Sequence, residues 1–110
     1  MTQKLFFILT VLTVTASFVA ASFAFEPGDE RKGKYMFRKN CRACHIDGGT
    51  AKALSPNSKT QAQWEKAFEK YDRYQCVAEW NKLTPEDRNN ILTYLYTHAI
   101  DSPAPATCAQ

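Results

Sequence analysis

The five residues Cys41-Arg42-Ala43-Cys44-His45 constrain this chain more than any other part of its sequence. Their C-x-x-C-H pattern is the attachment signature of c-type haem, in which two thiols bond to the porphyrin and the adjacent histidine binds the iron. Residues three apart on a helical turn project from one face, so both sulfurs can reach the same edge of the ring. The pattern predicts one haem c, attached covalently through Cys41 and Cys44, with His45 as the proximal iron ligand.

Two other kinds of site also use closely spaced cysteines. A thioredoxin-like redox pair would need a strand-helix-strand unit around it, and the flanking sequence shows no such alternation. A structural zinc site would need a second pair of ligands at short spacing, but Cys76 and Cys108 stand alone and His98 is the only further histidine. The sequence therefore favours haem attachment, with zinc and a disulfide or redox pair as the alternatives.

The first residues of the chain are typical of exported proteins. Lys4 supplies a positive charge, residues 5–19 form an apolar run, and Ser22-Phe23-Ala24 places small residues at the positions that define cleavage. We predict a signal peptide over residues 1–24, a mature chain that starts at Phe25, and a periplasmic or otherwise exported location. Export agrees with haem c, because its attachment is completed outside the cytoplasmic membrane. An uncleaved membrane anchor is the alternative, since the apolar run is just long enough to cross a bilayer.

The rest of the chain is predicted to consist of helices joined by loops, because it contains no convincing run of alternating β-branched residues. Asp29 is a helix N-cap candidate, and Thr84 begins another helix, with Pro85 at its first position and Asp87 three residues after the cap. The fold class is therefore all-α. The predicted boundaries are helices over 29–45, 60–74 and 84–100, a loop over 46–59, a domain over 25–102 and a C-terminal tail over 103–110.

The motif and the helices around it resemble a small monohaem class I cytochrome c over about residues 29–100. Gly33, Phe37 and Cys41 repeat at four-residue spacing, as in the first helix of that family, where the glycine permits close crossing of the last helix. The sequence that is similar to the family's terminal helix is Leu83-Thr84-Pro85-Glu86-Asp87, followed by Ile91 and Tyr94-Leu95. The resemblance implies a class I cytochrome c-like fold of about three to four helices around the haem.

The same resemblance bears on the iron's two axial positions. Pro56, eleven residues after His45, falls where the family places a proline whose carbonyl accepts the imidazole proton. The family's distal methionine is missing, since Met1 leaves with the signal peptide and Met36 lies on the helix that supplies the proximal ligand. We interpret Met36 as a core residue. The sixth iron ligand must then come from elsewhere or be absent.

His98, Cys76 and Cys108 remain as candidates on the distal side. His98 would give a bis-histidine iron, although its ordinary role would be that of a helix-terminal histidine. Cys76 lies close to where short cytochromes of the resembled family place their distal methionine, so its position suggests a thiolate ligand. A disulfide between Cys76 and Cys108 is nevertheless favoured, because these are the unassigned cysteines of an exported chain and a bridge would anchor the tail. Two free thiols are the third possibility.

These ligand alternatives separate two functions. A six-coordinate haem with one exposed edge carries electrons, whereas an open distal site binds small molecules and permits sensing or peroxide chemistry. Size and the family resemblance favour a single-electron carrier that is not an enzyme. Because no methionine follows His45, this carrier is expected to lack methionine as distal ligand. Its expected partners are redox enzymes or membrane-bound oxidoreductases, docked transiently. Loss of Lys4 with the signal peptide leaves 13 basic and 11 acidic residues, a net charge of +2, which argues for no nucleic acid partner. Contact with a membrane is expected only if the signal segment is retained.

Positive charge gathers near the attachment motif. The cluster is either a docking surface for acidic patches on redox partners or an ordinary solvated helix face. It consists of Lys32, Lys34, Arg38, Lys39 and Arg42.

Overall fold

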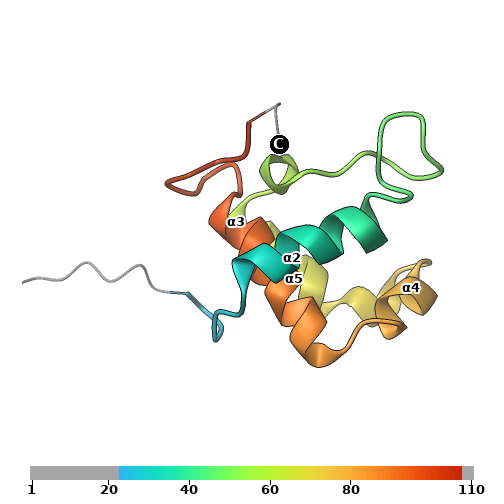
Figure 1. Ribbon diagram of the computed structural model, residues 1–110, viewed down its shortest axis with the longest axis horizontal. Helices are drawn as coiled ribbons and strands as arrows, with labels where there is room; N and C mark the ends of the chain where they lie inside the picture. The colour runs from blue at the N-terminus through green and yellow to red at the C-terminus, as the bar shows by residue number, and fades with distance from the viewer. Residues whose placement is uncertain (1–22, 108–110) are drawn as a thin grey trace, which may run out of the picture.

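The computed structural model describes residues 23–107, which contain helices and no strand (Figure 1). The all-α prediction is therefore confirmed for this part of the chain. Most of the predicted signal peptide, as well as Cys108, lies outside the described residues. No helix among the described residues has the length and apolar character needed to cross a membrane. The helical elements in order are α2 (Glu30–Met36), the π-helix η1 (Phe37–Cys41), the 3-10 helix η2 (Pro56–Ser58), α3 (Gln61–Glu69), the 3-10 helix η3 (Tyr71–Arg73), α4 (Val77–Asn81) and α5 (Pro85–Thr97).

The first helical segment begins as the sequence predicts. The side chain of Asp29 accepts a hydrogen bond from the Lys32 amide at 3.0 Å, which satisfies a free N–H of the first turn. At Phe37 the α-helix α2 widens into the π-helix η1, which ends at Cys41 rather than at His45. A π-helical turn is uncommon and is found most often at functional sites. Here it lies directly before the C-x-x-C-H residues.

Helix α2 crosses α5 in Figure 1, and a glycine allows the close approach. A Cβ atom on Gly33 would lie 1.9 Å from the backbone oxygen of Asn90, which no side chain could accept. Two backbone amides just before α2 also bond to α5, Gly28 to the Thr93 hydroxyl and Asp29 to the Asn90 side-chain oxygen, both at 2.8 Å. The crossing that the family resemblance implies is thus confirmed.

The other two long helices keep their predicted starts and end earlier than predicted. Thr60 and Thr84 each form a capping box with the residue three positions later, which fixes the first turns of α3 and α5. Helix α3 ends at Glu69, because the Lys70 backbone leaves the helical region (φ −105°, ψ 16°) before the short turn η3. Helix α5 ends at Thr97 instead of Ile100.

A short helix, α4, was not expected from the sequence. Five residues are too few to show a helical repeat of apolar positions. Trp80 of α4 packs edge-on against Phe68 of α3 and stacks on Tyr71 of η3, with ring centroids 4.8 Å and 5.5 Å apart. These aromatic contacts stabilise a helix that is too short to be stable alone.

The core lies between α2, α3 and α5, and the chain after α5 packs onto it. Ala106 is 6% exposed, and its N–H donates to the carbonyl oxygen of His98 at 3.0 Å. The segment predicted as a loose tail from residue 103 is therefore anchored as far as Ala106. The core consists of Phe37, Trp64, Leu83, Ile91, Leu92, Tyr94, Leu95 and Ala99.

Candidate functional site

An open, largely apolar cavity of about 230 Å³ lies beside η1. It could hold several water molecules by volume, but its walls offer few polar partners, and water needs two to four of them. Such a cavity instead suits a large apolar group. Its apolar walls are formed by Phe37, Leu54, Trp64, Phe68, Leu83 and Leu95.

The structure brings all three residues of the attachment motif to this cavity. Cys41, Cys44 and His45 line it together, because the π-helical turn and the following bend place them on one side. Burial, together with a smaller effect of the nearby Cys76, raises the pKa of the Cys41 thiol to about 11. A thiol with this pKa stays protonated at neutral pH, so it is held as a neutral group against the apolar wall. Cys44, in contrast, is exposed.

His45 is oriented by a backbone carbonyl. Its Nδ1 atom lies 2.7 Å from the carbonyl oxygen of Lys52, and a carbonyl can only accept, so Nδ1 carries the proton. This leaves the lone pair of Nε2 free for a metal ion. Fixing the ring through its other nitrogen is the usual support for a histidine ligand. The loop supplies this support because Leu54 and Ala51 donate their amides back to His45 and Cys44.

The predicted role of Pro56 is wrong in this structure. The Pro56 carbonyl accepts a hydrogen bond from the indole Nε1 of Trp64 at 2.8 Å instead of facing His45. Trp64 is buried, so its N–H needs a partner inside the protein. The loop between the motif and η2 turns back sooner than the family resemblance implies, which brings Lys52 to the imidazole.

Two adjacent glycines make that tight return possible. Gly48 has φ +77°, a conformation that side chains other than glycine rarely adopt. A Cβ atom on Gly49 would lie 2.3 Å from the carbonyl oxygen of Cys44. The glycine pair is visible in the sequence, but nothing there indicates which carbonyl it would deliver to His45.

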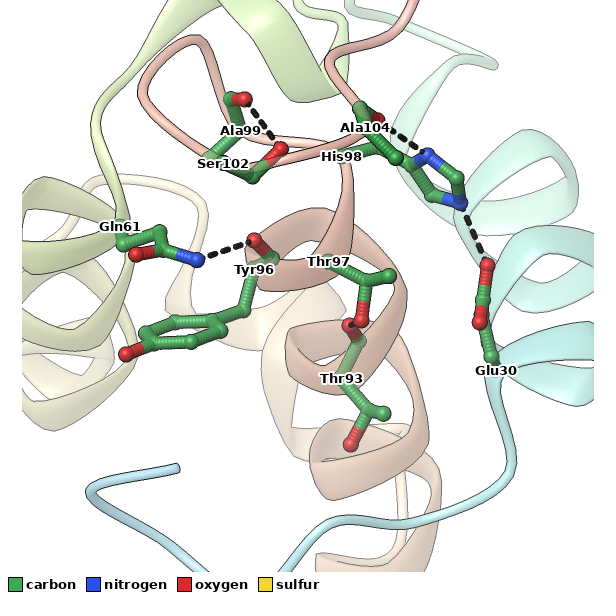
Figure 2. Close-up of polar contacts among 9 residues, drawn as sticks. All are labelled: Glu30, Gln61, Thr93, Tyr96, Thr97, His98, Ala99, Ser102 and Ala104. Carbon is green, nitrogen blue, oxygen red and sulfur yellow. Dashed lines mark hydrogen bonds and ion pairs between the residues drawn. The ribbon is translucent and has the colours of Figure 1, made fainter. Parts of the chain in front are cut away.

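The structure does not place His98 at the cavity, so its role as a distal ligand finds no support there. Both ring nitrogens of His98 are already in contact with oxygen atoms (Figure 2). Nδ1 lies 2.8 Å from the carbonyl oxygen of Ala104, and Nε2 contacts a carboxylate oxygen of Glu30. The physical reason is that α5 ends at Thr97, which turns His98 toward the first turn of α2 and away from the cavity.

Another part of the cavity wall is formed by α4 and the residue that precedes it. Cys76, Glu79 and Trp80 line the cavity, and the Glu79 carboxylate also pairs with Lys82 at 2.9 Å. Met36 does not line the cavity and packs against the core, as predicted. The sequence suggests that Cys76 lies on the distal side of the haem, but nothing in it indicates that Glu79 lines the cavity.

The predicted disulfide involves a residue outside the described part of the chain. The Cys76 thiol is exposed and forms no disulfide with any cysteine among residues 23–107. Cys108 lies outside the described residues. Ala106 is fixed beside His98, beyond the end of α5 that lies away from α4 in Figure 1. The bridge between Cys76 and Cys108 stays a prediction.

These residues fit a haem c. Two thiols three residues apart, an imidazole with a free Nε2 and apolar walls are the donor set and the surroundings that such a group needs. The zinc alternative finds no support in residues 23–107, where no three histidine, cysteine or acidic side chains are grouped to hold a metal ion.

Comparison with known proteins agrees with this geometry. The sequence model of the family described as "Cytochrome C oxidase, cbb3-type, subunit III" matches residues 28–95. That span contains the attachment motif, the cavity and most of α5. No solved structure matches the chain.

Proposed function

The chain belongs to the family of cytochrome c oxidase, cbb3-type, subunit III, a family of c-type cytochromes, and from this premise we propose that it carries single electrons through one haem c held by Cys41, Cys44 and His45. The observation that carries the proposal is the meeting of these three side chains at one apolar cavity. Residues 41–45 are the only C-x-x-C-H sequence in the chain, which supports a single haem.

The protein's own groups prepare the site for one-electron exchange. When bound, the haem supplies an iron that changes valence by one electron. The Lys52 carbonyl holds the His45 ring in one orientation and keeps the proton on Nδ1, so Nε2 would be free to bind the iron. The apolar walls exclude water, which keeps the rearrangement of the surroundings small when the charge changes.

The distal position is proposed to lack methionine. Met36 is packed in the core and Met1 is outside the described residues, so the cavity offers no thioether. The α4 side presents Cys76 and Glu79 instead. This arrangement favours, as a second candidate function, an open site that binds small ligands, because a thiol and a carboxylate are polar groups of the kind that such a pocket uses.

We propose that redox partners dock at the basic residues beside the motif. We also propose that segment 1–24 directs export of the protein. Burial raises the pKa of Tyr94, and Arg38 and Arg42 lie close enough to offset part of that rise. Lys39 lies over the ring of Tyr35, which is 62% exposed. An exposed basic surface of this kind attracts acidic patches on redox enzymes or membrane-bound oxidoreductases.

One optical experiment tests the proposal. The purified protein is recorded in both oxidation states, with and without carbon monoxide. A carrier gives a reversible haem c spectrum that carbon monoxide does not change. A reduced spectrum shifted by carbon monoxide would favour the open-site function, and a protein without a haem spectrum would overturn both.

A further inference from the structure

A polar contact outside the haem cavity joins three separate segments of the chain. His98, at the end of α5, contacts Glu30 in the first turn of α2 through Nε2 and the carbonyl oxygen of Ala104 through Nδ1 (Figure 2). The His98 side chain is 19% exposed and the Glu30 side chain 46%. The proposed electron transfer uses none of these groups.

The two contacts together require two protons. A carbonyl oxygen and an ionised carboxylate both act only as acceptors, whereas a neutral imidazole carries a single N–H. Neutral His98 can therefore satisfy Ala104 or Glu30, and only doubly protonated His98 satisfies both. An imidazolium between these two acceptors would donate one hydrogen bond to each.

We propose that His98, Glu30 and the Ala104 carbonyl form a proton-dependent clasp that holds the segment after α5 and the first turn of α2 to the end of α5. A histidine changes its charge between about pH 5 and 8, a range in which an exposed carboxylate stays ionised. The clasp is closed on the acid side of this range. Its contribution to stability is lost as the pH rises and His98 gives up one proton.

Among the described residues, Glu30 is the acidic side chain within ion-pair distance of His98, while Arg38 and Arg42 act on the neighbouring Tyr94. The ring of Tyr94, on α5 itself, lies 5.5 Å from the His98 ring between centroids, and burial raises its pKa, so it stays neutral over the same range. Residues 102–107 carry no charged side chain. The change in charge at His98 therefore acts through Glu30 and Ala104.

The Ala106 amide is the structural reporter of the clasp. It donates to the His98 carbonyl at 3.0 Å and belongs to a buried residue, so its exchange with solvent requires the segment after α5 to detach. Ser102, which is buried as well, donates its hydroxyl to the Ala99 carbonyl at 2.7 Å and keeps the turn itself in place. Opening of the clasp should therefore expose Ala106 while leaving the turn intact.

Nuclear magnetic resonance of the nitrogen-labelled holoprotein tests the clasp directly. The His98 ring nitrogens should both give imidazolium shifts at about pH 5.5, and the protection of the Ala106 amide, corrected for the pH dependence of free exchange, should fall about tenfold by about pH 8. In Glu30→Gln the His98 titration should move to lower pH. In His98→Gln the corrected protection of Ala106 should no longer depend on pH.

Glu69→Gln is the matched control, because Glu69 is exposed at the end of α3 and the same change there should leave the His98 titration as in the wild type. If His98→Gln does not fold, the wild type and Glu30→Gln decide the question. A neutral His98 ring at about pH 5.5, or a titration that Glu30→Gln does not move, would overturn the clasp. Neither outcome depends on which electron partner the haem serves.

Discussion

The backbone oxygen of Asn90 occupies the space that a side chain on Gly33 would need, 1.9 Å from an added Cβ atom. This contact sets the distance between α2, which leads into the attachment motif, and α5, which backs the cavity. Gly33→Ala should force the two helices apart and lower the free energy of unfolding by about 1–3 kcal/mol, despite alanine's better helix propensity. Chemical denaturation of the holoprotein measures the loss.

Lys32→Ala provides the comparison for that change, because Lys32 is exposed on the same helix. Its unfolding free energy should stay within about 0.5 kcal/mol of the wild type. Equal stability of Gly33→Ala and Lys32→Ala would show that the crossing is not as close as the structure has it.

Trp64→Phe should destabilise the loop that carries His45. The substitution removes the indole N–H and leaves the Pro56 carbonyl without its donor, at an expected loss of about 1–3 kcal/mol. Trp80→Phe is the control, since no hydrogen bond from its indole is found within residues 23–107, and it should cost less. Thermal unfolding followed at the haem absorption band distinguishes them, and a larger effect from Trp80→Phe would contradict the assignment.

His98→Ala should leave the haem absorption spectrum unchanged, because His98 lies outside the cavity. The oxidised wild type should also lack the weak absorption band of iron bound to methionine sulfur, since no methionine lines the cavity. Conversion of His98→Ala to a high-spin, carbon monoxide-binding haem would restore His98 as the ligand. A methionine band would mean that the chain rearranges around the haem.

Electron transfer to an acidic partner should slow as salt is added, because Lys32, Arg38 and Lys39 beside the motif are exposed and their charges are screened over about 10 Å at 0.1 M ionic strength. Arg38→Gln should lower the second-order rate several-fold at low salt. Lys82→Gln is the control, since Lys82 is paired with Glu79. Stopped-flow mixing with an acidic redox protein gives both rates, and equal rates would remove the proposed docking surface.

The sequence predicted those parts of the fold whose causes are local. Asp29 and Thr84 cap their helices as predicted, because capping depends on residues within three positions of each other. The C-x-x-C-H residues face one cavity for the same reason, since their spacing on a helical turn determines their direction.

The features that the sequence did not predict depend on contacts between distant segments. Pro56 lies at the spacing that the family resemblance implies, yet the buried Trp64 indole takes its carbonyl and the loop delivers Lys52 to His45. Helix α4 is stabilised by aromatic contacts with α3 and η3 rather than by its own five residues. His98 could be placed only once the end of α5 and the position of Glu30 were known.

The most direct test of the central claim, one haem c bonded to Cys41 and Cys44, is the mass of the exported protein under denaturing conditions. The wild type should have the mass of the chain that begins at Phe25 plus one haem, and it should keep its colour through acid-acetone extraction. The double variant Cys41→Ala/Cys44→Ala should lose the added haem mass and the colour. Cys76→Ser, which changes a cavity residue outside the motif, should keep the haem mass and the colour. A wild-type mass equal to that of the bare chain, or colour that is lost on extraction, would contradict the claim.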